Sequence, residues 1–202
     1  MHKASALVFL VGLACATPGP VSLDSNKEVR AEDYEKVLAK WTRTDQIYSK
    51  LYSVMFVHAT FHAPEFRRGF LVRHPDVYGP GSEEASRLLL TKPEGELQHE
   101  FFLSASTSTS KWNDLADDDS IWQVSLQGDD REPVDAKVER VKTTANLRVI
   151  YPYITDYART YAIHAPLVSP TGEPVVTNQT RRLTLRIASA LGEAKLIWEL
   201  VP

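Results

Sequence analysis

The sequence predicts an α+β domain that is rich in β-strand, with N-terminal helices followed by an antiparallel β-sandwich or open barrel. Two patterns support this fold class. Apolar residues recur at helical spacing in residues 32–41, whereas residues 101–200 contain several short runs in which apolar and polar residues alternate. Short alternating strands separated by turn-forming residues are typical of sandwiches and barrels. We therefore expect a single globular domain over residues 31–202.

The first predicted helix begins near Glu32 and is amphipathic. Its apolar side carries four residues at positions i, i+3, i+4 and i+7: Tyr34, Val37, Leu38 and Trp41. Charged residues fall on the other side, and the pattern allows the helix to continue to Tyr48. A second helix is predicted over Pro64–His74, because proline suits the first helical position and Pro75 discourages continuation. A third predicted helix covers residues 82–90.

Strands are predicted wherever apolar and polar residues alternate. Leu51–Phe61 is rich in β-branched and aromatic residues. Two alternating runs near the end of the chain, Leu183–Ile187 and Leu196–Leu200, flank a glycine-bearing connection and predict a terminal hairpin. The other predicted strands are marked by apolar residues that share one face: Phe101, Leu103 and Ala105; Trp122, Val124 and Leu126; Val134, Ala136 and Val138; Leu147, Val149 and Tyr151; Tyr157, Tyr161 and Ile163.

The first 15 residues have the three parts of a secretory signal. His2 and Lys3 give a positive start, residues 6–14 are apolar, and small residues follow. This apolar run is far shorter than the roughly 20 residues that span a bilayer. Gly12–Cys15 resembles the lipobox of bacterial lipoproteins, in which the cysteine becomes the first mature residue. The leucine that such signals prefer falls one place late, at Leu13.

Cys15 is therefore the predicted lipidation site, through which the protein would attach to a membrane. Ala16 follows the cysteine, and by resemblance to lipoprotein sorting signals this favours the outer membrane and a periplasmic or surface location. An alternative stays open, in which cleavage after Ala16 at an A-x-A site discards the cysteine. Both alternatives predict an exported protein of the cell envelope.

Residues 16–30 are predicted to form a flexible stalk, because they are polar and contain Pro18, Gly19 and Pro20. The chain has one cysteine, so no disulfide can brace the domain and a packed core must stabilise it. The formal net charge of -3 gives no indication of the basic surface that nucleic acids require. We therefore expect no nucleic-acid partner.

The histidines offer the most tempting chemical set. His58, His62 and Glu65 carry imidazoles and a carboxylate, the groups that bind catalytic zinc. On a strand, however, residues four apart stand about 13 Å apart, so one metal ion cannot bind both histidines directly. Three further histidines would complete a site only through contacts that the sequence cannot foresee: His74, His99 and His164. We therefore predict no catalytic, cofactor-binding or metal-binding residue, and no cofactor.

Three other features match known chemistry incompletely. Ser108–Lys111 fits the S-x-x-K pattern of penicillin-binding enzymes, but their S-D-N motif is absent and Lys142–Thr144 lacks the required glycine. The acidic loop Asp114–Asp119 carries carboxylates, which calcium binds, without the order of an EF-hand. A solvated acidic turn is the favoured interpretation. Arg182 and Arg186 share the outer face of a predicted strand, which indicates a charged sheet surface.

Four segments stand out across most of the mature chain: Trp41–Arg43, Ala59–Arg67, Trp112–Leu115 and Tyr151–Thr155. They resemble landmarks of an uncharacterised family of bacterial exported lipoproteins. The resemblance implies export and a lipid anchor, and it implies no particular activity or catalytic residue.

These observations lead us to expect a lipid-anchored envelope protein that acts as a binding or interaction module, with the membrane and an envelope protein as partners. Two alternatives stay open. One is a hydrolase of envelope substrates that uses His58 or His62 as a base, and the other is a structural subunit of an envelope complex. A binding module should contain a lined apolar pocket, an enzyme should have polar groups converging in a cleft, and a subunit should expose an apolar patch.

Overall fold

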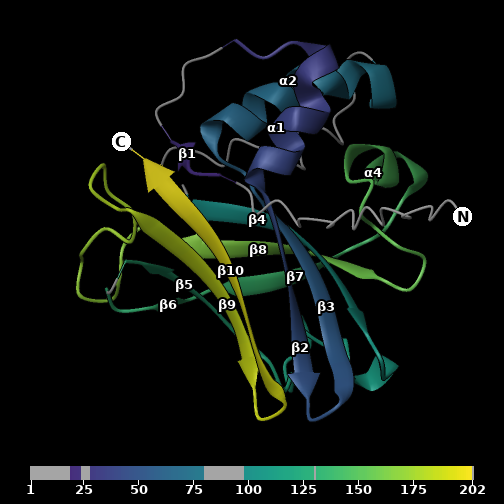
Figure 1. Cartoon of the computed structure of the whole chain (residues 1–202), viewed down its shortest axis with the longest axis vertical. Coiled ribbons are helices and arrows are strands. Elements are labelled where there is room, and N and C mark those ends of the chain that lie inside the picture. Colours follow the sequence, from purple (N-terminus) through teal and green to yellow (C-terminus); the bar gives the residue numbers. More distant parts are fainter. Residues whose placement is uncertain (1–18, 24–27, 80–97, 130, 202) are drawn as a thin grey trace, which may run out of the picture.

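The computed structural model describes residues 19–23, 28–79, 98–129 and 131–201. It shows a mixed α+β fold in which two five-stranded sheets face each other as a sandwich. The helices α1, α2 and α4 gather at one end of the sandwich, which we call the helical end (Figure 1). The turns of the β2–β3 and β9–β10 hairpins lie at the opposite end, the hairpin end (Figure 1). The predicted fold class is therefore confirmed.

All neighbouring strands are antiparallel except β1 and β10, which are parallel. The first sheet has the strand order β1 (Val21–Ser22), β10 (Gly192–Val201), β9 (Arg182–Ser189), β5 (Gln123–Gly128) and β6 (Val134–Asp135). The second sheet has the strand order β2 (Thr42–Ser49), β3 (Tyr52–Phe61), β4 (Gln98–Thr107), β8 (Arg159–Pro166) and β7 (Lys137–Val141). Residues 134–141 leave the first sheet as β6 and enter the second as β7, so they join the two sheets along one side.

Along the other side, side chains of β2 reach the backbone of β10. The Asp45 carboxylate accepts a hydrogen bond from the Lys195 amide at 2.6 Å. The Arg43 guanidinium donates to the Ile197 carbonyl oxygen at 2.7 Å. These contacts satisfy backbone groups of β10 that would otherwise lie unpaired at a sheet edge. The sandwich is therefore closed on both sides, like a flattened barrel.

Two close contacts assemble the helical end. A Cβ atom on Gly69 would lie 3.4 Å from the side chains of both Val29 and Val37, so α2 packs in contact with α1 and with the segment before it. The Tyr34 hydroxyl donates to the Ile150 carbonyl oxygen at 3.0 Å. No described helix is long and apolar enough to cross a membrane. The helices are α1 (Tyr34–Trp41), α2 (Pro64–Tyr78), α4 (Ala145–Ile150), and 3-10 turns at Ala31–Asp33 and Ser110–Trp112.

The core lies between the two sheets and is filled by alternate residues of each strand. Leu185 of β9 is fully buried and stands opposite Leu196 of β10, which is also fully buried. Trp198 packs on Phe101 with 5.3 Å between ring centroids. Its indole N–H donates to the Trp41 carbonyl oxygen at 2.9 Å, so the buried donor has a partner. The predicted terminal hairpin is confirmed by this packing.

The strand predicted through Leu147, Val149 and Tyr151 is wrong. Leu147 and Val149 lie in helix α4, and Tyr151 directly follows its last residue. The Thr144 hydroxyl caps this helix by accepting a hydrogen bond from the Leu147 amide at 3.1 Å. Leu147 and Ile150 are buried, whereas Val149 is 51% exposed. This is helical burial, and three alternating residues were too few to distinguish it from a strand.

Two helix ends also differ from the predictions. Helix α1 ends at Trp41, and β-branched Thr42 begins strand β2, so the extension to Tyr48 is wrong. Helix α2 continues through Pro75 to Tyr78. Proline leaves the carbonyl four residues earlier without its helical hydrogen bond. That residue, Leu71, is 59% exposed, so its carbonyl can bind water instead.

Strand pairing begins within the segment predicted to be a stalk. Val21 and Ser22 form strand β1, in register with Leu200 and Val201 of β10. Val21 is 1% exposed, so it belongs to the packed domain. Cys15, the rest of the signal segment and the helix predicted over residues 82–90 lie outside the described residues.

Candidate functional site

His58 lies in strand β3, as predicted, and takes part in packing contacts. Its Nδ1 atom is 2.9 Å from the Thr44 hydroxyl oxygen, and its ring stacks on Tyr153 with 5.1 Å between centroids. Burial lowers the pKa of His58, so the ring is neutral at pH 7. Among residues 19–23, 28–79, 98–129 and 131–201, no group of three or more His, Cys, Asp and Glu side chains is arranged to hold a metal ion.

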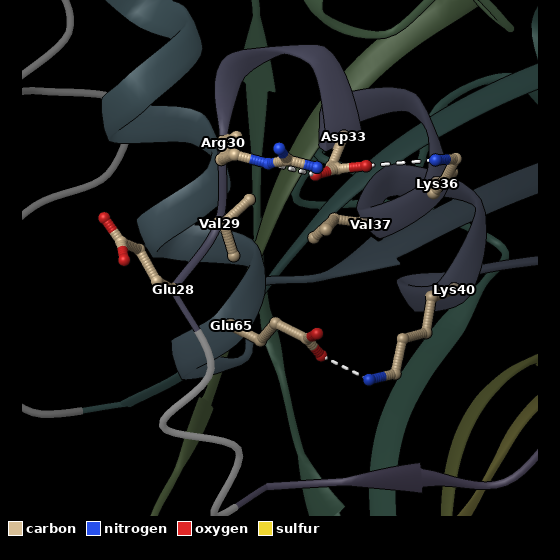
Figure 2. A pocket seen from close by; sticks show the side chains of 8 residues that line it. All are labelled: Glu28, Val29, Arg30, Asp33, Lys36, Val37, Lys40 and Glu65. Carbon is tan, nitrogen blue, oxygen red and sulfur yellow. Dashed lines mark hydrogen bonds and ion pairs between the residues drawn. The ribbon is translucent and has the colours of Figure 1, made fainter.

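Glu65 lies in a groove between α1 and the start of α2 (Figure 2). Its side chain is 7% exposed. The carboxylate accepts hydrogen bonds from Lys40 Nζ at 2.5 Å and from Trp41 Nε1 at 2.9 Å. The groove has a volume of about 670 Å³ and is lined by Glu28, Val29, Arg30, Asp33, Lys36, Val37, Lys40 and Glu65.

Most of the charges that line this groove are paired with one another. Asp33 accepts hydrogen bonds from Arg30 at 3.2 Å and from Lys36 at 3.0 Å, and these contacts lower its pKa. Glu65 is paired with Lys40, as Figure 2 shows. Such pairs hold α1, α2 and the preceding segment together. The groove therefore differs from the apolar pocket expected of a small-molecule binder.

The two incomplete motifs are built into the turns that follow β4. Ser108 continues the strand pairing, because its amide donates to the Val54 carbonyl oxygen at 3.2 Å. A serine at a strand end lacks the helix-start setting that the S-x-x-K chemistry requires. The Asp114 carboxylate accepts hydrogen bonds from the Ser120 hydroxyl at 3.5 Å and the Ile121 amide at 3.4 Å. The acidic loop thus uses one carboxylate to close its own turn.

The two predicted outer-face arginines are exposed and paired. Arg182 contacts Glu199 at 3.1 Å, and Arg186 contacts Glu193 at 2.8 Å. Both pairs join neighbouring strands β9 and β10 across the sheet. The charged sheet surface predicted from the sequence is therefore present.

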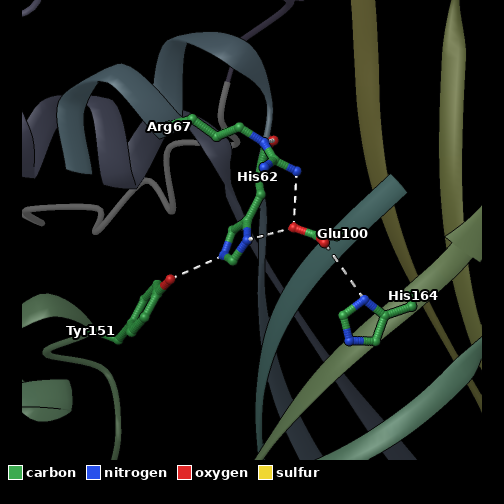
Figure 3. Close-up of polar contacts among 5 residues, drawn as sticks. All are labelled: His62, Arg67, Glu100, Tyr151 and His164. Carbon is green, nitrogen blue, oxygen red and sulfur yellow. Dashed lines mark hydrogen bonds and ion pairs between the residues drawn. The ribbon is translucent and has the colours of Figure 1, made fainter. Parts of the chain in front are cut away.

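The richest polar cluster is centred on Glu100, near the start of β4 (Figure 3). Glu100 Oε2 lies 2.9 Å from an Arg67 guanidinium nitrogen and 3.9 Å from His62 Nδ1. Glu100 Oε1 lies 3.7 Å from His164 Nδ1. On the far side of His62, Nε2 is 3.0 Å from the Tyr151 hydroxyl. Two histidines that the sequence could not connect are thus brought to one carboxylate.

Strand register explains this meeting. Glu100 stands directly opposite His164 in the antiparallel pairing of β4 and β8. The His62 amide donates to the Glu100 carbonyl oxygen at 2.9 Å, which continues the pairing of β3 and β4 by one residue. Arg67 lies one turn into α2, and its Nε donates to the His62 carbonyl oxygen at 2.8 Å. The sequence offered no signal for Glu100, because its partners are 33 to 64 residues away.

The protonation states of the cluster follow from burial and charge. Burial alone raises the pKa of Glu100, but His62, Arg67 and His164 outweigh it and lower that pKa below its ordinary value. Burial lowers the pKa of His62, and Glu100 opposes that effect only in part. Burial also raises the pKa of Tyr151. At pH 7 the Glu100 carboxylate is therefore ionised, the His62 imidazole is neutral and the Tyr151 phenol is protonated.

The order Tyr151, His62, Glu100 resembles the hydroxyl, base and orienting carboxylate of a catalytic triad. A triad, however, needs a hydroxyl that loses its proton to the base. The Tyr151 phenol is 2% exposed and keeps its proton, and its ring stacks on Phe102 with 3.9 Å between centroids. The geometry therefore suits a positioning network that holds α2 and the Tyr151 segment on the sheet.

A different kind of surface lies at the hairpin end. We define the distal surface as three residues around the β2–β3 turn: Tyr48, Leu51 and Tyr52. Their exposed fractions are 62%, 94% and 76%. Ser49 pairs with Tyr52, so Lys50 and Leu51 form a two-residue turn, and Lys50 has a φ of 57°. The sequence gives no signal for this turn, because it contains no glycine or asparagine.

Comparison with known proteins gives little further information. No protein-family model matches the chain, and no curated protein matches it significantly. One solved structure that is similar belongs to a Burkholderia pseudomallei protein of unknown function. It is 13% identical, the alignment covers 89% of this chain and 90% of that chain, and the TM-score is 0.40. The resemblance to exported lipoproteins therefore stays a prediction.

Proposed function

We propose that this protein is a lipid-anchored envelope protein, tethered through Cys15, that acts by binding another macromolecule through its distal surface. The observation that carries the proposal is the exposure of Leu51 and its two tyrosine neighbours in a domain whose other large apolar residues mostly fill the core. Burying apolar surface is favourable by about 25 cal/mol per Å². Contact with a partner that covers these side chains would therefore lower the free energy.

The polar groups support the same proposal. His58 and Glu65 bind neighbouring side chains, and His62 and Glu100 belong to a network that positions α2. The groove beside α1 is lined mostly by paired charges. Exposed apolar surface was the feature expected of a structural subunit, so the exposed hairpin turn favours an envelope complex over a free ligand as the partner.

The anchor is tested by the Cys15→Ser variant. We expect this change to abolish incorporation of labelled fatty acid and to move the protein from the membrane fraction to the soluble fraction. The attached chains supply nearly all of the membrane affinity, at about 0.8 kcal/mol per buried CH₂. A mature N-terminus at Thr17, found by mass spectrometry, would contradict lipidation and support the alternative cleavage.

The hydrolase alternative makes a different prediction about the histidines. We expect a His58→Ala, His62→Gln double variant that remains folded to replace the wild-type protein fully in a deletion strain. Thermal unfolding and membrane fractionation serve as controls for folding and location. A folded, correctly located variant that fails to replace the wild type would favour the hydrolase.

A further inference from the structure

Strand β10 separates the distal surface from the point where the tether enters the domain. Leu200, near one end of β10, pairs with Val21 of β1. Gly192, at the other end, pairs with Ser189 and lies in the turn of the β9–β10 hairpin. Eight residue steps of a strand extend about 27 Å. Figure 1 shows β1 beside the end of β10 and the hairpin turns at the opposite end of the molecule.

The tether is shorter than this separation. Six residue steps connect Cys15 with Val21, and a fully extended chain of that length spans at most about 21 Å. A tether folded back along β10 would still end about 6 Å short of the hairpin turn, whereas a tether that extends away from the domain places Cys15 beyond the helical end. With the tether extended away from the domain, the distal surface faces the aqueous space. This step rests on the proposed lipidation of Cys15.

The distal surface is held by two hairpins that pack side by side. Gly192 has a φ of +136°, and a Cβ atom there would lie 2.7 Å from Ile47 Cγ2 and 3.5 Å from the Tyr48 carbonyl oxygen. The Asp45 contact with the Lys195 amide joins the same two strands closer to the helical end. The Tyr48 hydroxyl donates to Gln46 Oε1 at 2.7 Å. A surface fixed in this way loses little conformational entropy on binding.

The side chains of the distal surface indicate what kind of partner would bind there. Leu51 stands in the β2–β3 turn with Tyr48 and Tyr52 on opposite faces of the hairpin, because Tyr48 pairs with Ser53 and Tyr52 pairs with Ser49. Tyrosine is enriched at protein interfaces. At the rim, Glu193 contacts both Arg186 at 2.8 Å and Lys195 at 2.6 Å, so its charge is neutralised locally. Lys50 forms no ion pair with any described residue. It therefore leaves one positive charge beside Leu51.

We infer that the distal surface binds a protein on the side of the domain away from the lipid-bearing membrane, and that this protein presents an apolar recess bordered by a carboxylate. The inference deepens the proposed function, because it names the partner of the same surface. The recess receives Leu51 and the two tyrosine rings, and the carboxylate faces Lys50.

The test uses the full-length lipidated protein with a photo-crosslinking amino acid at position 51. Position 157 is the matched control, because Tyr157 is 89% exposed and Leu51 is 94% exposed. We expect a discrete adduct with one protein from position 51 and none from position 157.

The protein identified in that adduct, once purified, should bind the Cys15→Ser domain. The Tyr48→Ser, Tyr52→Ser variant should weaken this binding by about 30-fold or more, as loss of interface anchors does. Lys50→Glu should weaken it by about tenfold.

Three outcomes would overturn the inference. An adduct with twice the mass of the chain would show that a second copy occupies the surface. Sedimentation of the Cys15→Ser domain with phosphatidylglycerol vesicles, lost in the tyrosine variant, would show a membrane contact instead. Equal adducts from positions 51 and 157 would show that the surface has no specific partner. Retention of the Cys15→Ser protein in the membrane fraction would contradict the lipid anchor alone, since the in vitro affinities of the tyrosine variant would still report on the distal surface.

Discussion

At the helical end, Glu65 and Glu100 have side chains that are 7% and 14% exposed, and both contact cations. At the hairpin end, Leu51 and Tyr52 are 94% and 76% exposed. One end of the sandwich thus buries charge, and the other end exposes apolar surface. Both arrangements oppose the usual distribution of residues between the inside and outside of a protein.

The physical costs of the two arrangements differ. A buried carboxylate loses hydration and is tolerated only with close partners, so removing a partner is strongly destabilising. An exposed leucine contributes almost nothing to folding, so replacing it leaves stability unchanged. The helical end should therefore respond to mutation through stability, whereas the hairpin end should respond through binding. The following predictions test this difference.

The largest expected loss of stability comes from the core between the two sheets, which both ends of the sandwich share. Leu185 is fully buried in the centre of β9, so Leu185→Asp should cost more than about 4 kcal/mol by burying an unpaired charge. Thr184 lies on the opposite face between exposed Arg182 and Arg186, and Thr184→Asp should change stability by less than about 0.5 kcal/mol. Urea unfolding of both variants gives the comparison. Equal losses would show that β9 is buried on both faces.

The cluster at the helical end gives the next largest effect. Glu100→Ala would leave the Arg67 guanidinium and two mostly buried histidines without their carboxylate. We expect a loss of about 3 kcal/mol in the free energy of unfolding. Glu139→Ala is the control, because this exposed residue of the same sheet contacts Lys137 and should cost less than about 0.5 kcal/mol. Similar values for both would show that the cluster contributes no more than a surface pair.

The pH dependence of stability should depend on His99, next to Glu100. Its Nε2 atom is buried without a hydrogen-bond partner among the described residues, and burial lowers its pKa to about 4. Between pH 6.5 and 4 the unfolded chain binds a proton at this residue and the folded chain does not. Stability is therefore lost as the pH falls through this window, by about 2 kcal/mol at pH 4.5.

The variant that isolates this effect is His99→Leu. Its free energy of unfolding should fall less between pH 7 and pH 4.5 than that of the wild type. The comparison at pH 7, where the histidine is neutral in both states, corrects for the change in packing beside Phe61. Parallel losses in both proteins would show that His99 is protonated in the folded state.

The sequence predicted the local structure well and the long-range contacts poorly. The terminal hairpin was readable because Leu183–Ile187 and Leu196–Leu200 alternate and follow each other closely. Helix α4 was readable in principle from Thr144, a good N-cap, but Leu147, Val149 and Tyr151 fit either period.

The candidate sites were harder to foresee for a physical reason. Glu100 meets His164 only because β4 pairs with β8, and no local pattern specifies which strands are neighbours. The alternation in Leu51–Phe61 predicted strand β3, but it did not reveal that Leu51 would lie in an exposed turn. That exposure depends on the turn at Lys50, a residue that seldom adopts a positive φ.

The smallest expected difference between paired variants lies at the hairpin end, where stability and binding should separate. Gly192 and Gly172 both have positive φ, at +136° and +86°, so alanine at either position should cost about 1 kcal/mol or more of backbone strain. Only Gly192 has a close neighbour, because its new Cβ atom would lie 2.7 Å from Ile47, whereas nothing lies within 4 Å at Gly172. Gly192→Ala should therefore cost about 1 kcal/mol more than Gly172→Ala. It should also push the two hairpins apart and weaken crosslinking from position 51, which Gly172→Ala should leave unchanged. Equal stability losses with equal crosslinking would mean that the β9–β10 turn does not brace the distal surface, and that Tyr48 and Leu51 keep their arrangement without it.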